Sequence, residues 1–301
     1  MTAIRGVNVA AVTAWREGPE LDLGATFELI DYLSASGVNG IALLGSTGEF
    51  LHFEIAERIR LVTLAVKRSR APVIAGVAHS SLDGAVVLAR EAAAAGAAAL
   101  LLMPPYFFRY SEEDVREFYL HFAKELKDAA PIFLYNIPFF TTAIACETAL
   151  ELLATGLFAG IKDSSGNWDY FVRLKEAHKQ HAFTLLVGND VVFTRARQAG
   201  ADGVVSGVAC AIPELMLGLD AAILSGDAGK TQRLEARLQE FISWLDHFPV
   251  PLGIREALKV RGLKVGPAGV PLGPRGLDQL AAFREWFKAW LPIVQKDSRS
   301  A

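Results

Sequence analysis

Cysteine is scarce in this sequence. The 301 residues include two cysteines, Cys146 and Cys210, and they lie far apart along the chain. Small secreted domains held by disulfides carry many more, and a structural zinc site usually needs paired CxxC motifs. The sequence therefore predicts neither a disulfide framework nor a structural zinc site.

An excess of charge of either sign is also lacking. The 30 basic and 33 acidic side chains give a net charge of −3, so nucleic acid and anionic membranes are not expected partners. The most apolar stretch, residues 84–105, is interrupted by Arg90 and Glu91 and does not resemble a membrane span. The first 20 residues lack the apolar run and cleavage site of a signal peptide. We therefore expect a cytoplasmic protein.

Short apolar runs are plentiful, in a chain that is 52% hydrophobic. Each is followed by turn residues and then by a longer stretch with helical spacing. Continuously apolar runs are typical of parallel strands that are covered on both faces. The runs comprise residues 7–15, 38–45, 72–78, 98–105, 131–138, 158–165, 183–190 and 203–210.

Amphipathic segments separate these runs, as in residues 53–69 and 111–128. Glycine is expected just after the C-terminus of a helix. The glycines that stand in such positions are Gly37, Gly96, Gly156 and Gly200. Eight alternating strand–helix units predict an α/β fold, a (β/α)₈ TIM barrel. A dinucleotide-binding open sheet is disfavoured, because no GxGxxG motif follows the first strand.

Further helices are expected after the eighth unit, at 213–226 and 228–247 and within 251–260 and 277–291. We assign residues 1–226 to the barrel and residues 227–301 to a C-terminal helical extension packed on it. The aromatic side chains within 283–291 recur at helical spacing, which predicts a packing face rather than a ligand site.

Lys162 is the most informative polar residue, because it follows the buried run of the sixth strand. In a TIM barrel the chemistry lies at the carboxyl ends of the strands. Burial favours the neutral amine of a lysine, which is the form that attacks a carbonyl group. The alternative is a structural lysine paired with Asp163 or with another carboxylate.

Two other strand ends carry groups that suit the same chemistry. Tyr135 ends the fifth strand, where a phenol can move protons during imine formation, although a half-buried aromatic residue is common there. The turn GSTGE at 45–49 follows the second strand, and its hydroxyl and N–H groups suit a carboxylate. Such residues also serve as ordinary turns and caps. Glu49 is expected to fix the turn by accepting backbone hydrogen bonds.

The motifs GSTGE (45–49), YNIP (135–138) and GIKDSSG (160–166), in this order, resemble the dihydrodipicolinate synthase / N-acetylneuraminate lyase family. The resemblance extends over nearly the whole chain. It implies that Lys162 forms a Schiff base with pyruvate or another 2-oxo acid and that Tyr135 is the proton shuttle. It also implies a homotetramer or dimer and no metal or organic cofactor.

The resemblance implies further binding residues. Ser46 and Thr47 would hold the substrate carboxylate, and Gly188 and Val205 would line the pocket with backbone carbonyl groups. The histidines form no HxH or HExxH motif, which argues against a metal-dependent aldolase.

The chain departs from the family pattern at two aromatic residues. Phe140 occupies the place of the arginine that binds the second substrate's carboxylate in dihydrodipicolinate synthase, and Phe107 occupies the place of a relay tyrosine. A phenyl ring replaces neither a guanidinium nor a hydroxyl group. Tyr106 is a candidate substitute for the missing phenol. The sialic acid lyase pattern is also incomplete. Its acidic residue is present as Asp190, but Val191 stands where that pattern has a glutamate.

These observations predict a lyase, a class I aldolase that makes or cleaves a carbon–carbon bond between a 2-oxo acid and an aldehyde. The alternatives are the family's synthase activity itself, a 2-keto-3-deoxy sugar acid aldolase or dehydratase, and a non-catalytic 2-oxo-acid-binding homologue. Keeping both Lys162 and Tyr135 argues against a mere binder, which needs neither.

Overall fold

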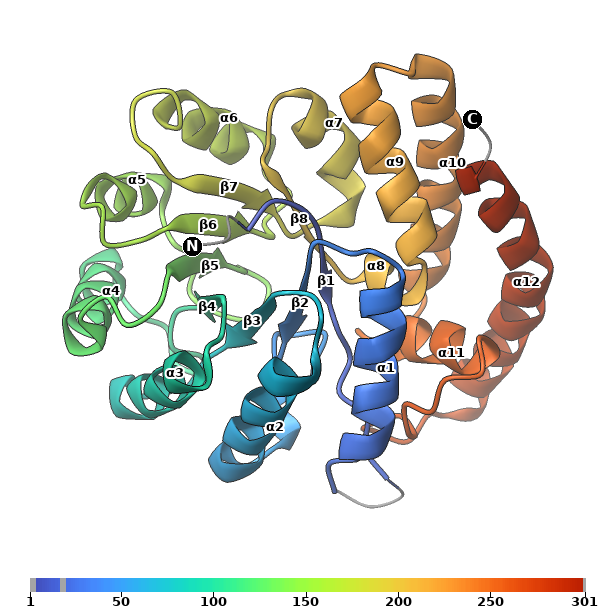
Figure 1. Ribbon diagram of the computed structural model, residues 1–301, viewed down its shortest axis with the longest axis horizontal. Coiled ribbons are helices and arrows are strands. Elements are labelled where there is room, and N and C mark those ends of the chain that lie inside the picture. Colours follow the sequence, from blue (N-terminus) through green and yellow to red (C-terminus); the bar gives the residue numbers. More distant parts are fainter. Residues whose placement is uncertain (1–3, 17–19, 300–301) are drawn as a thin grey trace.

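Eight parallel strands form a closed barrel in the computed structural model, which describes residues 4–16 and 20–299 (Figure 1). Each strand pairs with the next, and β8 pairs with β1 to close the sheet. The strands are β1 (Gly6–Ala10), β2 (Gly40–Leu43), β3 (Val73–Gly76), β4 (Ala99–Leu102), β5 (Ile132–Asn136), β6 (Gly160–Asp163), β7 (Thr184–Val187) and β8 (Gly203–Ser206). The predicted TIM barrel is confirmed. The structure does not describe residues 1–3, 17–19 and 300–301. The first residues of the predicted barrel region, the last residues of the predicted C-terminal extension and part of the segment examined for a signal peptide therefore lie outside the described residues.

Helices surround the barrel and follow its strands in sequence order (Figure 1). They are α1 (Leu23–Ala35), α2 (Ile55–Arg68), α3 (Leu82–Ala95), α4 (Glu112–Leu126), α5 (Cys146–Ala154), α6 (Trp168–Ala177) and α7 (Phe193–Gln198). Two short 3₁₀ helices, η1 (Phe50–His52) and η2 (Asp190–Val192), follow β2 and β7. The alternation predicted from the apolar runs is confirmed.

Local sequence explains where several helices begin and end. Ser111 caps α4 by accepting a hydrogen bond from the Asp114 amide, and Asp114 in turn accepts from the Ser111 amide, which forms a capping box. Each glycine predicted to follow a helix adopts the left-handed conformation that glycine tolerates best. Their φ angles are 83° at Gly37, 91° at Gly96, 75° at Gly156 and 95° at Gly200.

The C-terminal part of the chain is helical and lies to one side of the barrel (Figure 1). α8 (Val208–Ala211) and α9 (Pro213–Ser225) follow β8 and pack against β1, and α10 (Ala228–Leu245), α11 (Leu252–Val260) and α12 (Pro274–Arg299) continue beyond them. Phe283 and Phe287 of α12 are fully buried and pack on Phe241 of α10. The aromatic side chains of 283–291 therefore form a packing face, as predicted.

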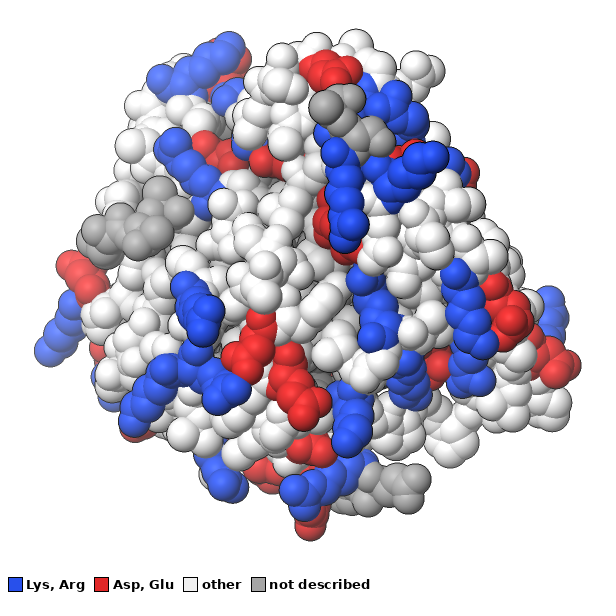
Figure 2. Space-filling model, turned by 45° about the vertical axis from the view of Figure 1, so that its right-hand side comes forward, with Lys and Arg blue, Asp and Glu red and all other residues white. Residues whose placement is uncertain are grey.

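Charged side chains of both signs are intermixed on the face shown in Figure 2, where neither sign forms one continuous patch. One apolar core contains side chains from the barrel strands and from the helices that pack on them. Among the described residues, no helix is both long enough and apolar enough to cross a membrane.

Candidate active site

Lys162 is the third residue of β6 and is 3% exposed. The sheet register places it between Tyr135 of β5 and Leu186 of β7. Its ammonium nitrogen lies 4.0 Å from the centre of the Tyr135 ring, within the distance of a cation–π contact. Lys162 forms no ion pair within 4.0 Å inside the described ranges, so a structural pair with Asp163 is not what holds it.

Gly188 directly follows β7 and leaves room for the lysine. A Cβ atom at this position would overlap the Oγ of Ser164 and the Cε of Lys162. The Gly188 amide also donates a 2.7 Å hydrogen bond to the carbonyl oxygen of Asp163, which fixes the strand end. Any larger residue here would therefore force the Ser164 or Lys162 side chain to shift.

Tyr135 is 1% exposed and connects Lys162 with the turn after β2. Its hydroxyl oxygen lies 3.1 Å from the Oγ of Ser46, and either atom can donate the hydrogen bond. An amine, a phenol and an alcohol from three different strand ends are therefore contiguous. This arrangement can hold a carbonyl compound at the amine and move protons beside it.

The turn at 45–49 has an irregular backbone. Leu44 and Glu49 have φ angles of 57° and 50°, unusual values for residues with a side chain, and η1 rather than an α-helix follows. Thr13 donates a 2.8 Å hydrogen bond to the Gly48 carbonyl oxygen, which ties the turn to the segment after β1. Thr47 is buried, next to the start of α8.

Val205 lies apart from the contacts that join Lys162, Tyr135 and Ser46. It is 1% exposed and sits within β8, opposite Asn8 of β1. The structure thus brings four predicted site residues into direct contact, namely Lys162, Tyr135, Ser46 and Gly188, and places Thr47 and Val205 in the neighbouring turn and strand.

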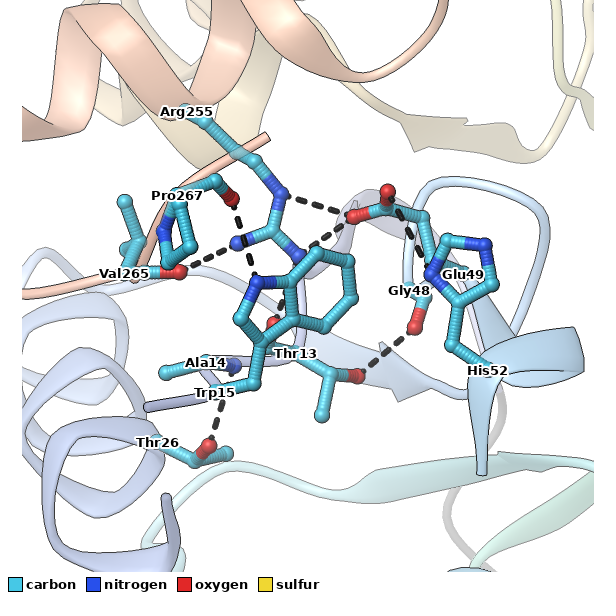
Figure 3. A network of polar contacts seen from close by, with 10 residues as sticks. All are labelled: Thr13, Ala14, Trp15, Thr26, Gly48, Glu49, His52, Arg255, Val265 and Pro267. Atoms are coloured by element: carbon cyan, nitrogen blue, oxygen red, sulfur yellow. Dashed lines mark hydrogen bonds and ion pairs between the residues drawn. The ribbon is translucent and has the colours of Figure 1, made fainter. Parts of the chain in front are cut away.

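Glu49 is held by Arg255 of α11, as Figure 3 shows. The Nε of Arg255 donates to the Glu49 carboxylate at 2.7 Å, and its Nη2 donates both to the same carboxylate and, at 2.7 Å, to the carbonyl oxygen of Thr13. Its Nη1 donates to the carbonyl oxygen of Val265. The guanidinium also lies 3.9 Å from the centre of the Trp15 ring. Glu49 was expected to accept hydrogen bonds from the backbone. Its carboxylate instead accepts them from the side chain of Arg255.

The charges of Glu49 and Arg255 stabilise each other in a largely buried environment. Burial raises the pKa of the Glu49 carboxyl, and the charge of Arg255 opposes this. Burial likewise lowers the pKa of the Arg255 guanidinium, and the charge of Glu49 opposes that. Each group therefore stabilises the charged form of the other, in surroundings that penalise a lone charge.

Asp163, next to the lysine, is a structural anchor. Its carboxylate accepts hydrogen bonds from the Asn136 amide group at 2.8 Å and from the backbone N–H and the hydroxyl of Ser165 at 3.1 and 2.8 Å. Burial raises the pKa of this carboxyl, and these hydrogen bonds oppose the rise. Asp163 thus joins the ends of β5 and β6.

Asp190 in η2 is a second, partly buried carboxyl group near the lysine. Burial raises its pKa, and the nearby Ser206 hydroxyl, the Val208 amide and the charge of Lys162 oppose the rise. One oxygen accepts from the Val208 amide at 3.3 Å. The other, Oδ1, is shielded from solvent and has no hydrogen-bond partner in the described part of the chain. This oxygen is a free acceptor within the charge field of Lys162.

A cavity of about 590 Å³ adjoins the site at Ser46. Its lining includes Tyr106, Phe107 and Phe140, from the segments after β4 and β5, and residues 249–252 and 268–272 from the C-terminal part of the chain. The two phenylalanines that depart from the family pattern thus line the same space. Tyr106 packs on Phe50 at a ring distance of 5.5 Å and pairs with Thr141 through an isolated β-bridge.

Arg255 and Asn136 were not singled out by the sequence analysis. Arg255 is separated from Glu49 by 206 positions, and only its place inside the apolar run PLGIREAL hinted at burial. Asn136 follows Tyr135 directly, and its amide group accepts from the Ile144 backbone as well as donating to Asp163. An amide residue at the end of a buried strand was the available signal.

The fold and these contacts define a TIM-barrel protein with a polar site at the carboxyl ends of its strands. The model of the dihydrodipicolinate synthetase family matches residues 3–289, and the chain belongs to this family. Relatives in this family are named synthases and lyases, and the chain is a lyase.

Individual relatives agree with this assignment. The chain is 34% identical to the 4-hydroxy-tetrahydrodipicolinate synthase of Azoarcus sp. (strain BH72), over 90% of this chain and 93% of that protein. The structure of the synthase from Methylacidiphilum fumariolicum SolV superposes with a TM-score of 0.88 at 28% identity, covering 98% and 99% of the two chains. Sialic acid aldolase of Ruminococcus gnavus, at 23% identity, has the same fold with a TM-score of 0.87 over 96% and 99%.

Proposed function

We propose that this lyase is a class I aldolase in which Lys162 forms a Schiff base with pyruvate or another 2-oxo acid. The single observation that carries the proposal is the contiguous set of Lys162, Tyr135 and Ser46. Ser46 and Thr47 bind the carboxylate, while Gly188 and Val205 offer backbone carbonyl groups. Tyr135 moves protons between the intermediates. No external cofactor is needed, because the lysine itself activates the substrate.

The reaction balances without an oxidant or a reductant. The neutral amine of Lys162 adds to the ketone, and loss of one water gives the imine. Loss of a proton from the adjacent methyl group gives the enamine, whose carbon attacks the aldehyde carbon while the aldehyde oxygen takes up a proton. Water then hydrolyses the new imine, which releases a 4-hydroxy-2-oxo acid and restores the amine. The reverse sequence cleaves the same bond.

Trapping with borohydride tests this proposal. With pyruvate, reduction is expected to add the mass of a reduced pyruvyl group to Lys162, as located by peptide mapping. The Lys162→Ala variant is expected to show no adduct, whereas Lys124→Ala, on the exposed face of α4, is expected to react as the parent does. The absence of an adduct with pyruvate and with longer 2-oxo acids alike would contradict the proposal.

We also propose a homodimer or homotetramer, for which the exposed aromatic side chains give support. Phe107 is 87% exposed, Phe108 64% and Phe139 70%, and such apolar surface is usually covered by a partner. Light scattering at several concentrations measures the mass, and a monomer throughout would refute this. The boundary between the barrel and the extension near residue 226 and a cytoplasmic location remain predictions from the sequence.

A further inference from the structure

The cavity beside Ser46 is lined mainly by apolar groups. The lining includes Met103 and Phe140, which follow β4 and β5, together with Val250, Val270 and Leu272 from the C-terminal part of the chain. Its volume of about 590 Å³ is within the range of roughly 300–1,000 Å³ that is usual for small-molecule sites. It has room for a substituent considerably larger than a short hydroxylated chain.

The buried guanidinium and the carboxylate in the lining, Arg255 and Glu49, are already paired with each other. Arg255 donates hydrogen bonds from each of its three guanidinium nitrogens to Glu49, Thr13 and Val265. Glu49 accepts from Arg255 and lies 3.9 Å from the ring nitrogen of His52. A substrate carboxylate that entered the cavity would therefore lose water without gaining an unoccupied guanidinium. This loss disfavours a charged substituent, and the apolar walls favour an uncharged one.

The cavity is also positioned to receive the second substrate. Ser46 belongs both to its lining and to the hydrogen bond with Tyr135, whose ring contacts Lys162. An aldehyde whose carbonyl carbon meets the enamine on Lys162 can therefore extend its substituent along Ser46 into this space.

We propose that the second substrate is an aldehyde with an uncharged aromatic or branched aliphatic substituent that occupies this cavity. This inference rests on the proposed aldolase function. The new bond joins the methyl-derived carbon of pyruvate to the aldehyde carbon, and the aldehyde oxygen becomes a hydroxyl group. The substituent takes no part in bond making.

Turnover with pyruvate and a panel of aldehydes tests the inference. The panel contains 3-phenylpropanal as the apolar member, glyceraldehyde as the hydroxylated member and aspartate semialdehyde as the charged member. We expect kcat/KM for 3-phenylpropanal to exceed that for each of the other two by about tenfold or more, as is usual for discrimination by an apolar pocket. A preference for glyceraldehyde or aspartate semialdehyde would overturn the inference.

A matched pair of variants separates the cavity from the intrinsic reactivity of the aldehydes. Val270 lines the cavity and is 71% exposed, so Val270→Asp adds a charge without disturbing the core. Val172, which is 47% exposed on α6, lies outside the lining and provides Val172→Asp as the control. We expect Val270→Asp to reduce the preference for 3-phenylpropanal about tenfold and Val172→Asp to leave it unchanged.

Borohydride trapping of pyruvate on both variants tests the aldolase proposal separately from the cavity assignment. An intact adduct together with an unchanged aldehyde preference in Val270→Asp would overturn the cavity assignment and leave the aldolase proposal standing. A change of oligomeric mass in Val270→Asp without a change in preference would mean that a second copy of the chain covers this surface, which also overturns the assignment. Failure of the parent protein to form an adduct would refute the aldolase proposal itself.

Discussion

Arg255 of α11 donates hydrogen bonds to Glu49, 206 positions earlier in the chain. Arg255 is 1% exposed, and its guanidinium also holds carbonyl oxygens of Thr13 and Val265 (Figure 3). Because Glu49 belongs to the same turn as Ser46, this ion pair couples the C-terminal helices to the proposed carboxylate-binding turn. A helix outside the barrel thus helps to shape the site.

Removing this guanidinium is expected to be strongly destabilising. Arg255→Met leaves the buried Glu49 carboxylate unpaired, for which a loss of about 3–5 kcal/mol in the free energy of unfolding is expected. Urea denaturation measures it. The control Arg90→Met removes an exposed pair with Glu125, so its unfolding midpoint is expected to stay nearly unchanged. Equal midpoints for the two variants would show that the buried pair contributes little.

The fold was predictable from the sequence because its signals are local. Apolar runs, helical spacing and glycines such as Gly96 act over a few residues and identify each strand–helix unit. The ion pair between Glu49 and Arg255 was not predictable. The two residues are far apart in sequence, and their distance in space depends on how α11 packs. Lys162 and Tyr135 were found because each marks the end of an apolar run. Phe107 and Phe140 of the cavity beside them were noticed because they depart from the family pattern, whereas the rest of its lining was not found, because segments 249–252 and 268–272 carry no motif.

Removing the Tyr135 hydroxyl group tests its proposed role as proton shuttle. Tyr135→Phe keeps the ring beside Lys162 and removes the hydroxyl that contacts Ser46. We expect kcat to fall by about 10²- to 10⁴-fold, which is the usual contribution of a positioned acid or base. Tyr119→Phe is the control, because that hydroxyl is also buried and donates a 2.9 Å hydrogen bond to the Leu102 carbonyl oxygen. It is expected to lose stability and keep kcat; similar kcat values in both variants would refute the assigned role.

Phe140→Arg restores a cation at the cavity wall, where Phe140 is 57% exposed. We expect kcat/KM for aspartate semialdehyde to rise about 10- to 100-fold, since a hydrogen bond to a charged group contributes about 1.5–3 kcal/mol. Phe139→Arg is the neighbouring control, because Phe139 is exposed and does not line the cavity. Efficient turnover of aspartate semialdehyde by the parent protein would show that Phe140 does not limit it.

The dependence of stability on pH tests the burial of Asp190. Because burial raises the pKa of Asp190 above its ordinary value of 3.8, the folded protein binds the proton more tightly than the unfolded chain. At any pH where the folded protein binds more protons than the unfolded chain, the free energy of unfolding decreases as the pH rises. As the pH rises from 3.8 through the raised pKa, the parent is therefore expected to lose stability relative to Asp190→Asn. Urea unfolding between about pH 3 and pH 7 measures the difference.

A carboxyl group with the opposite shift provides the control for that experiment. Hydrogen bonds from Ser111 lower the pKa of Asp114 below 3.8. Asp114 therefore contributes stability that is present above 3.8 and lost as the pH falls through the lowered pKa. The difference between the parent and Asp114→Asn is expected to change in the opposite direction, and at lower pH. The same direction in both series would contradict the burial of Asp190.

Gly188→Ala tests whether the room beside Lys162 matters for the chemistry. The added methyl group would overlap the Oγ of Ser164 and the Cε of Lys162, so one or both of these side chains have to shift. We expect the rate of pyruvate trapping by borohydride to fall at least about tenfold, because a small displacement of a reacting group has a large effect on rate. Gly229→Ala, near the start of α10, is the control, since its Cβ would meet no atom closer than 3.7 Å. An adduct formed at the parent rate in Gly188→Ala would mean that the amine reaches the substrate by another path, and the placement of Lys162 against Gly188 would then have no part in catalysis.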